Sequence, residues 1–276
     1  MTAATLRLMR SAPWSARLGI VLIAIYVFVA IFAPLIAPYG ERAIVGYEYE
    51  PWSAQFLLGT DNLGRDMLSR LLYGARNTVG IAFATTLLAF FLGGTLGLIA
   101  AALGGWTDQA LSRLVDVMMA IPQLIFALLI LTIVGTSVLS LILVIAVLDS
   151  TRVYRLARAV AMNIVVMDFV EAAKLRGEGL WWIIRHEILP NAMPPLVAEF
   201  GLRFCFVFLF ISALSFLGLG IQPPTADWGS MVRENATLIS FGDITPLLPA
   251  ACIALLTIAV NFVVDWFLMK TSGLKE

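Results

Sequence analysis

The chain has 276 residues, of which 61% are hydrophobic and 13% are charged, and its 18 basic and 18 acidic residues leave no net charge. Because so few polar residues cannot cover the surface of a soluble domain of this length, the composition predicts a membrane protein. Zero net charge provides no general attraction to nucleic acid, which we therefore exclude as a partner.

Six apolar runs are long enough to cross a bilayer as helices, since a span needs about 20 residues and open backbone cannot lie in lipid. They cover residues 18–38, 78–103, 112–134, 137–157, 196–220 and 247–269. The first run exceeds the apolar part of a signal peptide, about 7–15 residues, so we interpret it as an uncleaved anchor. No Ser-rich or Gly-rich linker divides the chain. We therefore expect one all-α domain over residues 1–276 with six transmembrane helices.

Lysine and arginine are unevenly distributed between the two ends of these runs. With the N-terminus in the cytoplasm, twelve fall in inner segments and five in outer segments. This bias predicts that both termini are cytoplasmic. Residues 1–17 are then the cytoplasmic N-terminus, residues 39–77 form the first outer loop, and residues 158–195 form the largest cytoplasmic segment.

Charged residues inside the runs need partners, because an isolated charge in hydrocarbon is costly. Glu199 and Arg203 are four residues apart, and Arg113 and Asp116 are three apart. Each pair can meet on one face of its helix. We therefore expect two intramembrane charge pairs.

Other acidic residues leave a second interpretation open. Asp149 has Arg152 and Arg155 nearby in sequence, whereas Asp265 has no evident partner in its own run. Structural pairing near the cytoplasmic interface is one interpretation. The alternative is an ion-coupled secondary transporter in which Asp149, Glu199 or Asp265 binds the proton.

A polar stretch inside the segment 158–195 is the most distinctive motif. Its residue pattern is Glu171, Ala172, Ala173, Leu175, Gly177, and then Leu189 and Pro190. We expect two short helices, over residues 171–176 and 180–187, with Gly177 and Gly179 allowing a bend and Pro190 closing the second helix.

This stretch resembles the cytoplasmic signature of permease subunits of bacterial ATP-binding-cassette importers. The resemblance implies a coupling helix that sits in a cleft of a separate ATPase subunit. Glu171 would meet a basic group there, and the small Ala172 and Ala173 would let the other surface approach closely. The alternative, compatible with the first, is an amphipathic helix resting on lipid headgroups through Trp181, Trp182, Ile183 and Ile184.

Further segments resemble the second permease of dipeptide, oligopeptide and nickel importers. These are residues 59–66, 69–76 and 216–229, so the resemblance covers about residues 59–265. The simplest role of residues 59–66 is turn chemistry, with Gly and Asn accepting positive φ and Asp or Thr capping the next helix. Docking of a binding protein is a second possibility for this segment.

The resemblance implies an inner-membrane permease that forms half of a pathway for peptides or similar small solutes. Its partners would be a homologous second permease, two ABC ATPase subunits, a periplasmic or lipid-anchored binding protein, and membrane lipid. The outer loop 39–77 would then be periplasmic. ATP and Mg²⁺ would be bound by the ATPase subunits, with no cofactor in this chain.

No catalytic site is evident in the sequence. The chain has no G-x-x-x-x-G-K-[ST] phosphate loop, and its single histidine, His186, excludes a histidine cluster for zinc. Cys205 and Cys252 lie in apolar runs, where thiols usually serve as packing residues. We therefore expect no catalytic or metal site and a transport subunit without ATPase activity of its own; the sequence assigns no substrate-binding residue.

Overall fold

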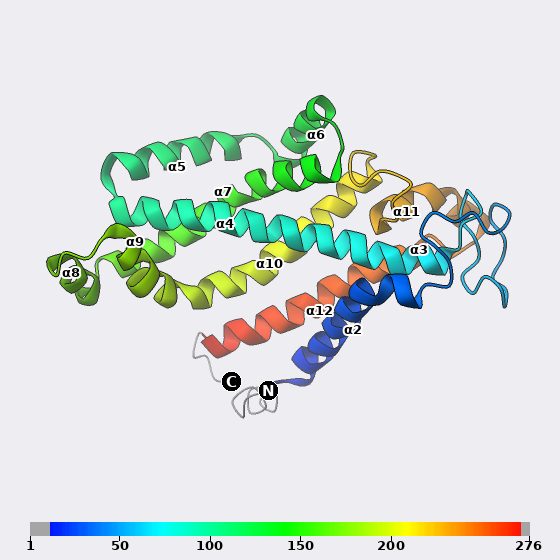
Figure 1. Cartoon of the computed structure of the whole chain (residues 1–276), viewed down its shortest axis with the longest axis horizontal. Coiled ribbons are helices and arrows are strands. Elements are labelled where there is room, and N and C mark those ends of the chain that lie inside the picture. The colour runs from blue at the N-terminus through cyan, green and yellow to red at the C-terminus, as the bar shows by residue number, and fades with distance from the viewer. Residues whose placement is uncertain (1–11, 272–276) are drawn as a thin grey trace. The chain divides into compact units, whose positions relative to one another are not determined.

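The computed structural model describes residues 12–271 (Figure 1). Arg7, Arg10 and Lys275, which contribute to the charge bias, lie outside the described residues. Within this range the chain is helical, and extended pairing is limited to isolated bridges between Ile44 and Arg65 and between Thr60 and Asp66. The all-α prediction is confirmed for these residues.

The described residues form two compact units. The first contains residues 12–83, 135–141 and 205–271, and the second contains residues 84–134 and 142–204. Three long helices have residues in both units, so the chain passes from one unit to the other within helices: α4 (Gly80–Leu103), α7 (Val138–Val165) and α10 (Leu189–Phe216).

The first unit is built on two apolar helices that run side by side, α2 (Trp14–Ile36) and α12 (Leu247–Thr271) (Figure 1). A Cβ atom on Gly19 of α2 would lie 2.5 Å from the carbonyl oxygen of Ala259 on α12. Only glycine allows this close approach. The Tyr26 hydroxyl donates to the Cys252 carbonyl at 3.0 Å and adds a polar link between the same helices.

The remaining elements of this unit are short. They are α3 (Met67–Gly74), a π-helical turn (Ala75–Val79), α11 (Trp228–Asn235) and a 3-10 helix (Ala236–Phe241). Residues 59–66 precede α3 as a tight loop in which Gly59 and Gly64 both have φ of +72°. The Asp66 side chain caps α3 by accepting from the Ser69 backbone N–H at 2.8 Å. The turn-and-cap interpretation of this loop is confirmed for the glycines and for Asp66, whereas Asn62 does not take a positive φ.

A buried charge cluster ties the same loop to α11. The Asp61 carboxylate lies 2.6 Å from Arg65 Nε and 3.1 Å from Arg70 Nε, and all three side chains are almost fully buried. Glu234 on α11 lies 3.4 Å from Arg65 Nη2 and 3.5 Å from Arg70 Nη2. Two arginines and two carboxylates therefore neutralise one another, as buried charges must.

Asp227, another buried carboxylate, caps the N-terminus of α11. Asp227 accepts from the Ser230 backbone N–H at 2.8 Å and from the Thr78 hydroxyl at 2.9 Å. Burial raises the pKa of the Asp227 carboxyl, although these hydrogen bonds act in the opposite direction. Asp227 is therefore a buried N-cap that is held by hydrogen bonds to both of its carboxylate oxygens.

The second unit contains the other helices: α5 (Gly105–Ala120), α6 (Gln123–Val134), α8 (Asp168–Leu175), α9 (Leu180–Ile183) and a π-helical turn (Ile184–Ile188). Its parts of α4 and α7 pack closely. A Cβ on Gly97 would lie 2.7 Å from the Tyr154 carbonyl oxygen, and one on Gly93 would overlap the Ser150 carbonyl. These glycines let the two helix backbones approach.

Four helical runs are long and apolar enough to cross a membrane: Trp14–Ile36, Met67–Leu103, Leu180–Phe216 and Leu247–Lys270. The expected straight span over residues 112–134 is instead broken into α5 and α6, which meet at 88° and would together make a fifth span. The break follows from Pro122, because a proline disfavours helical conformation in the residue before it. Ile121 indeed has φ −91° and ψ 131°.

Candidate functional site

The polar stretch singled out in the sequence forms a compact pair of short helices, α8 and α9, at one end of the second unit (Figure 1). We call residues 168–188 the α8–α9 segment. The end of α8 is closed at Gly177, which has φ of +82°. The Gly177 N–H donates to the Lys174 carbonyl at 3.0 Å, and the Glu178 N–H donates to the Ala173 carbonyl at 3.2 Å. This is the Schellman arrangement, in which a left-handed glycine ends a helix and turns the chain.

Arg176 stabilises the turn from outside. Its guanidinium lies 3.7 Å from Glu178 and 3.9 Å from Glu187, and stands 5.6 Å from the centre of the Trp182 ring. Trp182 in turn stacks on His186. These contacts link the end of α8 to α9 and to the π-helical turn that follows it.

One face of the segment is buried in the second unit. Val170 and Ala173 of α8, together with Ile183, Ile184 and Ile188, belong to a continuous apolar core. The residues that meet them come from the ends of α4 and α7 and from the start of α10: Leu98, Ala101, Ala157, Ala161, Ile164, Ala192 and Leu196. The segment is therefore anchored on the long helices.

The opposite face is open. Glu171, Ala172 and Leu175 are exposed, with 83% of Leu175 accessible, and 64% of Trp181 is accessible. Ala173 differs from the expectation that both alanines admit another surface, because it is fully buried in the core of this chain. The available face thus combines a carboxylate, a small residue and a large apolar side chain.

Pro190 does not end a helix, and this expectation from the sequence is wrong. The helical run continues from Leu180 through Leu189 and Pro190 to Phe216. In the π-helical turn just before the proline, the Leu189 N–H donates to the Ile184 carbonyl, five residues back. Such local widening is a common way for a helix to accommodate proline. Consequently α9 runs on into α10 with no helix end between them.

The charged residues expected within the membrane form two different groups. Arg203 Nε lies 2.7 Å from Glu199 Oε1, one turn earlier on α10, and Arg203 Nη1 lies 3.7 Å from Asp149 Oδ1 on α7. Asp149 therefore contacts an arginine of another helix instead of Arg152 or Arg155.

Asp116 departs from its expected pairing. Its Oδ1 accepts from Arg155 Nη2 at 2.7 Å, rather than from Arg113, the partner expected from spacing. Asp108 likewise accepts from Arg158. Each of these bonds joins α5 to α7, so contact between helices replaces pairing within α5.

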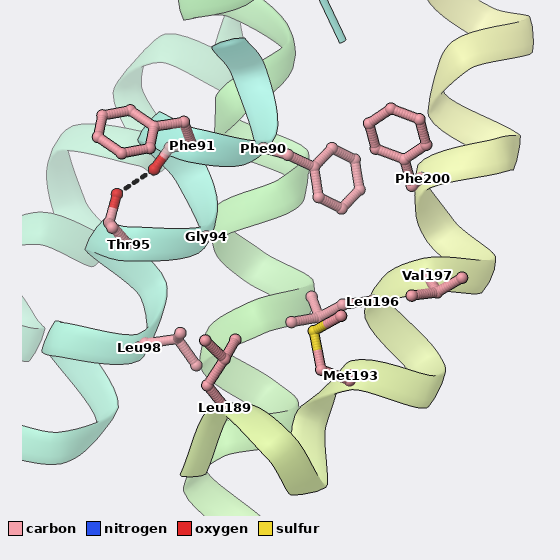
Figure 2. Close-up of a pocket in the computed structure, with 10 residues that line it drawn as sticks. All are labelled: Phe90, Phe91, Gly94, Thr95, Leu98, Leu189, Met193, Leu196, Val197 and Phe200. Carbon is pink, nitrogen blue, oxygen red and sulfur yellow. Dashed lines mark hydrogen bonds between the residues drawn. The ribbon is translucent and has the colours of Figure 1, made fainter. Parts of the chain in front are cut away.

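An apolar groove lies between α4 and α10, with a volume of about 380 Å³ (Figure 2). Figure 2 shows the rings of Phe90 and Phe200 next to each other, and they meet edge-on with their centroids 5.1 Å apart. Thr95 is the one polar side chain among its ten lining residues, and its hydroxyl already donates to the Phe91 carbonyl. The groove therefore suits hydrocarbon and offers nothing to hold a charged solute.

Chemistry of other kinds finds no support in the described part of the chain. Within residues 12–271, no group of three or more His, Cys, Asp or Glu side chains could hold a metal ion.

Sequence reasoning missed two sets of contacts. Arg176 contacts Glu178, Glu187 and Trp182, and Arg203 contacts Asp149. Nothing in local spacing signals contacts between separate helices.

Known proteins are similar to this chain in sequence and in fold. The family described as "Binding-protein-dependent transport system inner membrane component" matches residues 93–269. The chain is 35% identical to "Dipeptide transport system permease protein DppC" of Alkalihalophilus pseudofirmus, over 90% of this chain and 82% of that protein. It is 36% identical to "Di/tripeptide transport system permease protein DppC" of Pseudomonas aeruginosa, over 90% of this chain and 84% of that one.

Among solved structures, the fold is similar to that of a chain of the inward-facing MetNI methionine ABC transporter. The TM-score is 0.55 at 20% identity, covering 73% of this chain and 97% of the other. At this identity the likeness concerns the fold alone. On the evidence of the family match and the identity to its relatives, this chain belongs to the inner-membrane permease components of binding-protein-dependent ABC transport systems.

Proposed function

We propose that this chain forms half of the translocation pathway of an ATP-driven importer for peptides or similar small solutes. Two of its relatives are named for the transport of dipeptides and of di- and tripeptides, which supports the solute class. Membership of the permease family supports ATP-driven import over the ion-coupled alternative.

The observation that carries the mechanism is the rigid, half-exposed α8–α9 segment and its continuity with α10. Its buried face is fixed to the core of the second unit, and its open face presents Glu171, Ala172 and Leu175. We infer that an ATPase subunit binds this face and that Glu171 meets a basic group there. Because α9 continues into α10 without a helix end between them, movement of the bound segment is passed on to a membrane helix.

The proposed topology has six spans, counting α5 and α6 as one broken span and α7 as another. Both termini are then cytoplasmic, which the charge bias supports. The α8–α9 segment lies between spans four and five, on the cytoplasmic side. The whole chain acts as a single transmembrane domain in this proposal.

The proposed assembly contains a homologous second permease, two ATPase subunits that bind ATP and Mg²⁺, and an extracytoplasmic binding protein. The binding protein releases solute into the pathway after ATP closes the ATPase pair. Hydrolysis then returns the pathway to the inward-open state. This chain supplies no catalytic group to that cycle; it forms half of the pathway and transmits motion to it.

Substitution of Glu171 tests the proposal. In the reconstituted importer, Glu171→Lys should abolish ATP-driven uptake, and Glu171→Gln should reduce it less, because only Lys places a like charge against the basic group. Replacing that basic residue of the ATPase subunit with an acidic one should restore uptake in the importer that carries Glu171→Lys. Full uptake by Glu171→Lys, at normal membrane abundance, would contradict the proposed contact.

A further inference from the structure

The break between α5 and α6 borders a second cavity, of about 180 Å³. This cavity is lined by Met118, Met119, Ile121, Pro122, Gln123, Leu148, Thr151 and Arg152. Its volume is far above the roughly 10–15 Å³ that one water molecule requires. Unlike the groove in Figure 2, it offers polar groups to an occupant.

Arg152 is the charge in this lining. It is residue 15 of α7, counting from Val138, so it lies about 21 Å along the helix from its start at a rise of 1.5 Å per residue. In the proposed topology, in which α7 is a span that begins near Val138, that position lies within a hydrocarbon layer about 30 Å thick. A cation at this depth normally faces a water-filled cavity or a counter-charge, because hydrocarbon does not stabilise it.

The neighbouring charges leave Arg152 available. The carboxylates of Asp149 and Glu199 both contact Arg203, and Asp116 is bound by Arg155. Among residues 12–271, no carboxylate lies within ion-pair distance of Arg152 and no hydrogen bond joins it to another side chain. Asp149 acts on it only through longer-range electrostatics.

The broken helix adds donors at the same place. The Pro122 carbonyl accepts the first helical bond of α6, from the Phe126 N–H at 3.0 Å. The N–H groups of the first turn of α6, beginning at Gln123, therefore lack partners within the helix. These groups carry partial positive charge and reinforce the preference of a guanidinium for an anion.

We propose that this cavity is a solute subsite on the translocation pathway, in which Arg152 receives a carboxylate of the transported peptide. The inference rests on the proposed import function. A free peptide always carries a terminal carboxylate, and the planar guanidinium matches a carboxylate in shape and charge. The cavity is polar enough to bind this group in passing and too small to enclose a whole peptide.

The test measures dipeptide uptake by the complete importer in proteoliposomes, with saturating binding protein. We expect the maximal uptake rate to fall at least tenfold in Arg152→Gln, to fall further in Arg152→Glu, and to stay intermediate in Arg152→Lys. ATPase activity stimulated by the binding protein should stay within twofold of wild type, because Arg152 lies outside the α8–α9 segment. Arg155→Gln, which alters an exposed pair on the same helix, is the matched control and should leave uptake unchanged.

Three results would overturn the subsite. Unchanged uptake in Arg152→Gln would show that no carboxylate depends on Arg152. Equal uptake by Arg152→Gln and Arg152→Glu would remove the electrostatic argument. A parallel loss of uptake, ATPase activity and thermal stability of the complex would make Arg152 an assembly residue, paired with a carboxylate of the second permease. Failure of the proposed import function would be recognised separately, since the wild-type importer itself would then show no ATP-dependent uptake.

Discussion

Gly177 provides a graded test of the α8–α9 segment, because its substitution changes the backbone and almost nothing else. A Cβ atom at this position would have no heavy atom within 4 Å, so added side-chain bulk meets open space. The φ of +82° is the constraint. A left-handed conformation costs an ordinary L residue about 1–2 kcal/mol and costs asparagine less.

The expected effects follow from that conformational cost. Gly177→Ala should reduce the population of the observed bend by about 5- to 30-fold, provided that no bound subunit stabilises the bend. Gly177→Pro goes further, because proline fixes φ near −65° and removes the N–H that donates to Lys174. That lost hydrogen bond adds about 0.5–1.5 kcal/mol. Uptake should therefore decrease in the order Gly, Asn, Ala and Pro, and Pro should lower it by at least tenfold.

The assay compares ATP-driven uptake with ATP hydrolysis in the same proteoliposomes. The ratio of solute transported to ATP hydrolysed should fall along the series, while membrane abundance stays within about twofold because the turn lies outside the apolar core. Gly179→Ala is the matched control: Gly179 has φ −75°, and a Cβ there also meets open space. Normal uptake by Gly177→Pro, or an equal loss in Gly179→Ala, would refute the reasoning from the left-handed bend.

Three predictions concern stability, measured by thermal unfolding in detergent. Gly97→Ala should destabilise the protein by about 1–3 kcal/mol because the new methyl group presses on the α7 backbone, whereas Gly94→Ala, which meets open space, should be neutral or stabilising; equal effects would contradict the packing argument. Asp61→Asn should cost about 3–5 kcal/mol because it leaves buried arginines short of negative charge, and an unchanged melting temperature would mean that the cluster is not desolvated. Asp227→Ala should cost about 1–2 kcal/mol, whereas Asp227→Asn, which keeps the cap and removes a buried charge, should cost little; the reverse order would show that the charge is needed.

The sequence predicts the helical class and most helix positions well, because apolar runs of about 20 residues have few alternatives in a bilayer. It also contains the break in the third run, which Pro122 marks. The same reasoning fails at Pro190, because a π-helical turn, which has no clear sequence signal, carries the helix past the proline. The residue type alone therefore could not separate a helix end from an accommodated proline.

The α8–α9 segment shows the same division between local and distant information. Its acidic and small residues and the role of Gly177 as a bend are readable from the order of residues. That Ala172 is open while Ala173 is buried depends on packing against α4 and α7. The contact of Arg203 with Asp149 on α7 could likewise not be predicted from the sequence, because only the packing of separate helices brings the two residues together.

Site-directed cross-linking tests the central claim most directly. Leu175→Cys places a thiol at the most exposed apolar position of α8, in a background in which Cys205 and Cys252 are replaced by alanine. In the assembled importer, this thiol should cross-link to an ATPase subunit, and the yield should change when ATP is bound. Phe241→Cys, equally exposed on the opposite side of the proposed topology, should give no such product. Absence of an ATPase cross-link from Leu175→Cys in a complex that transports normally would contradict the account.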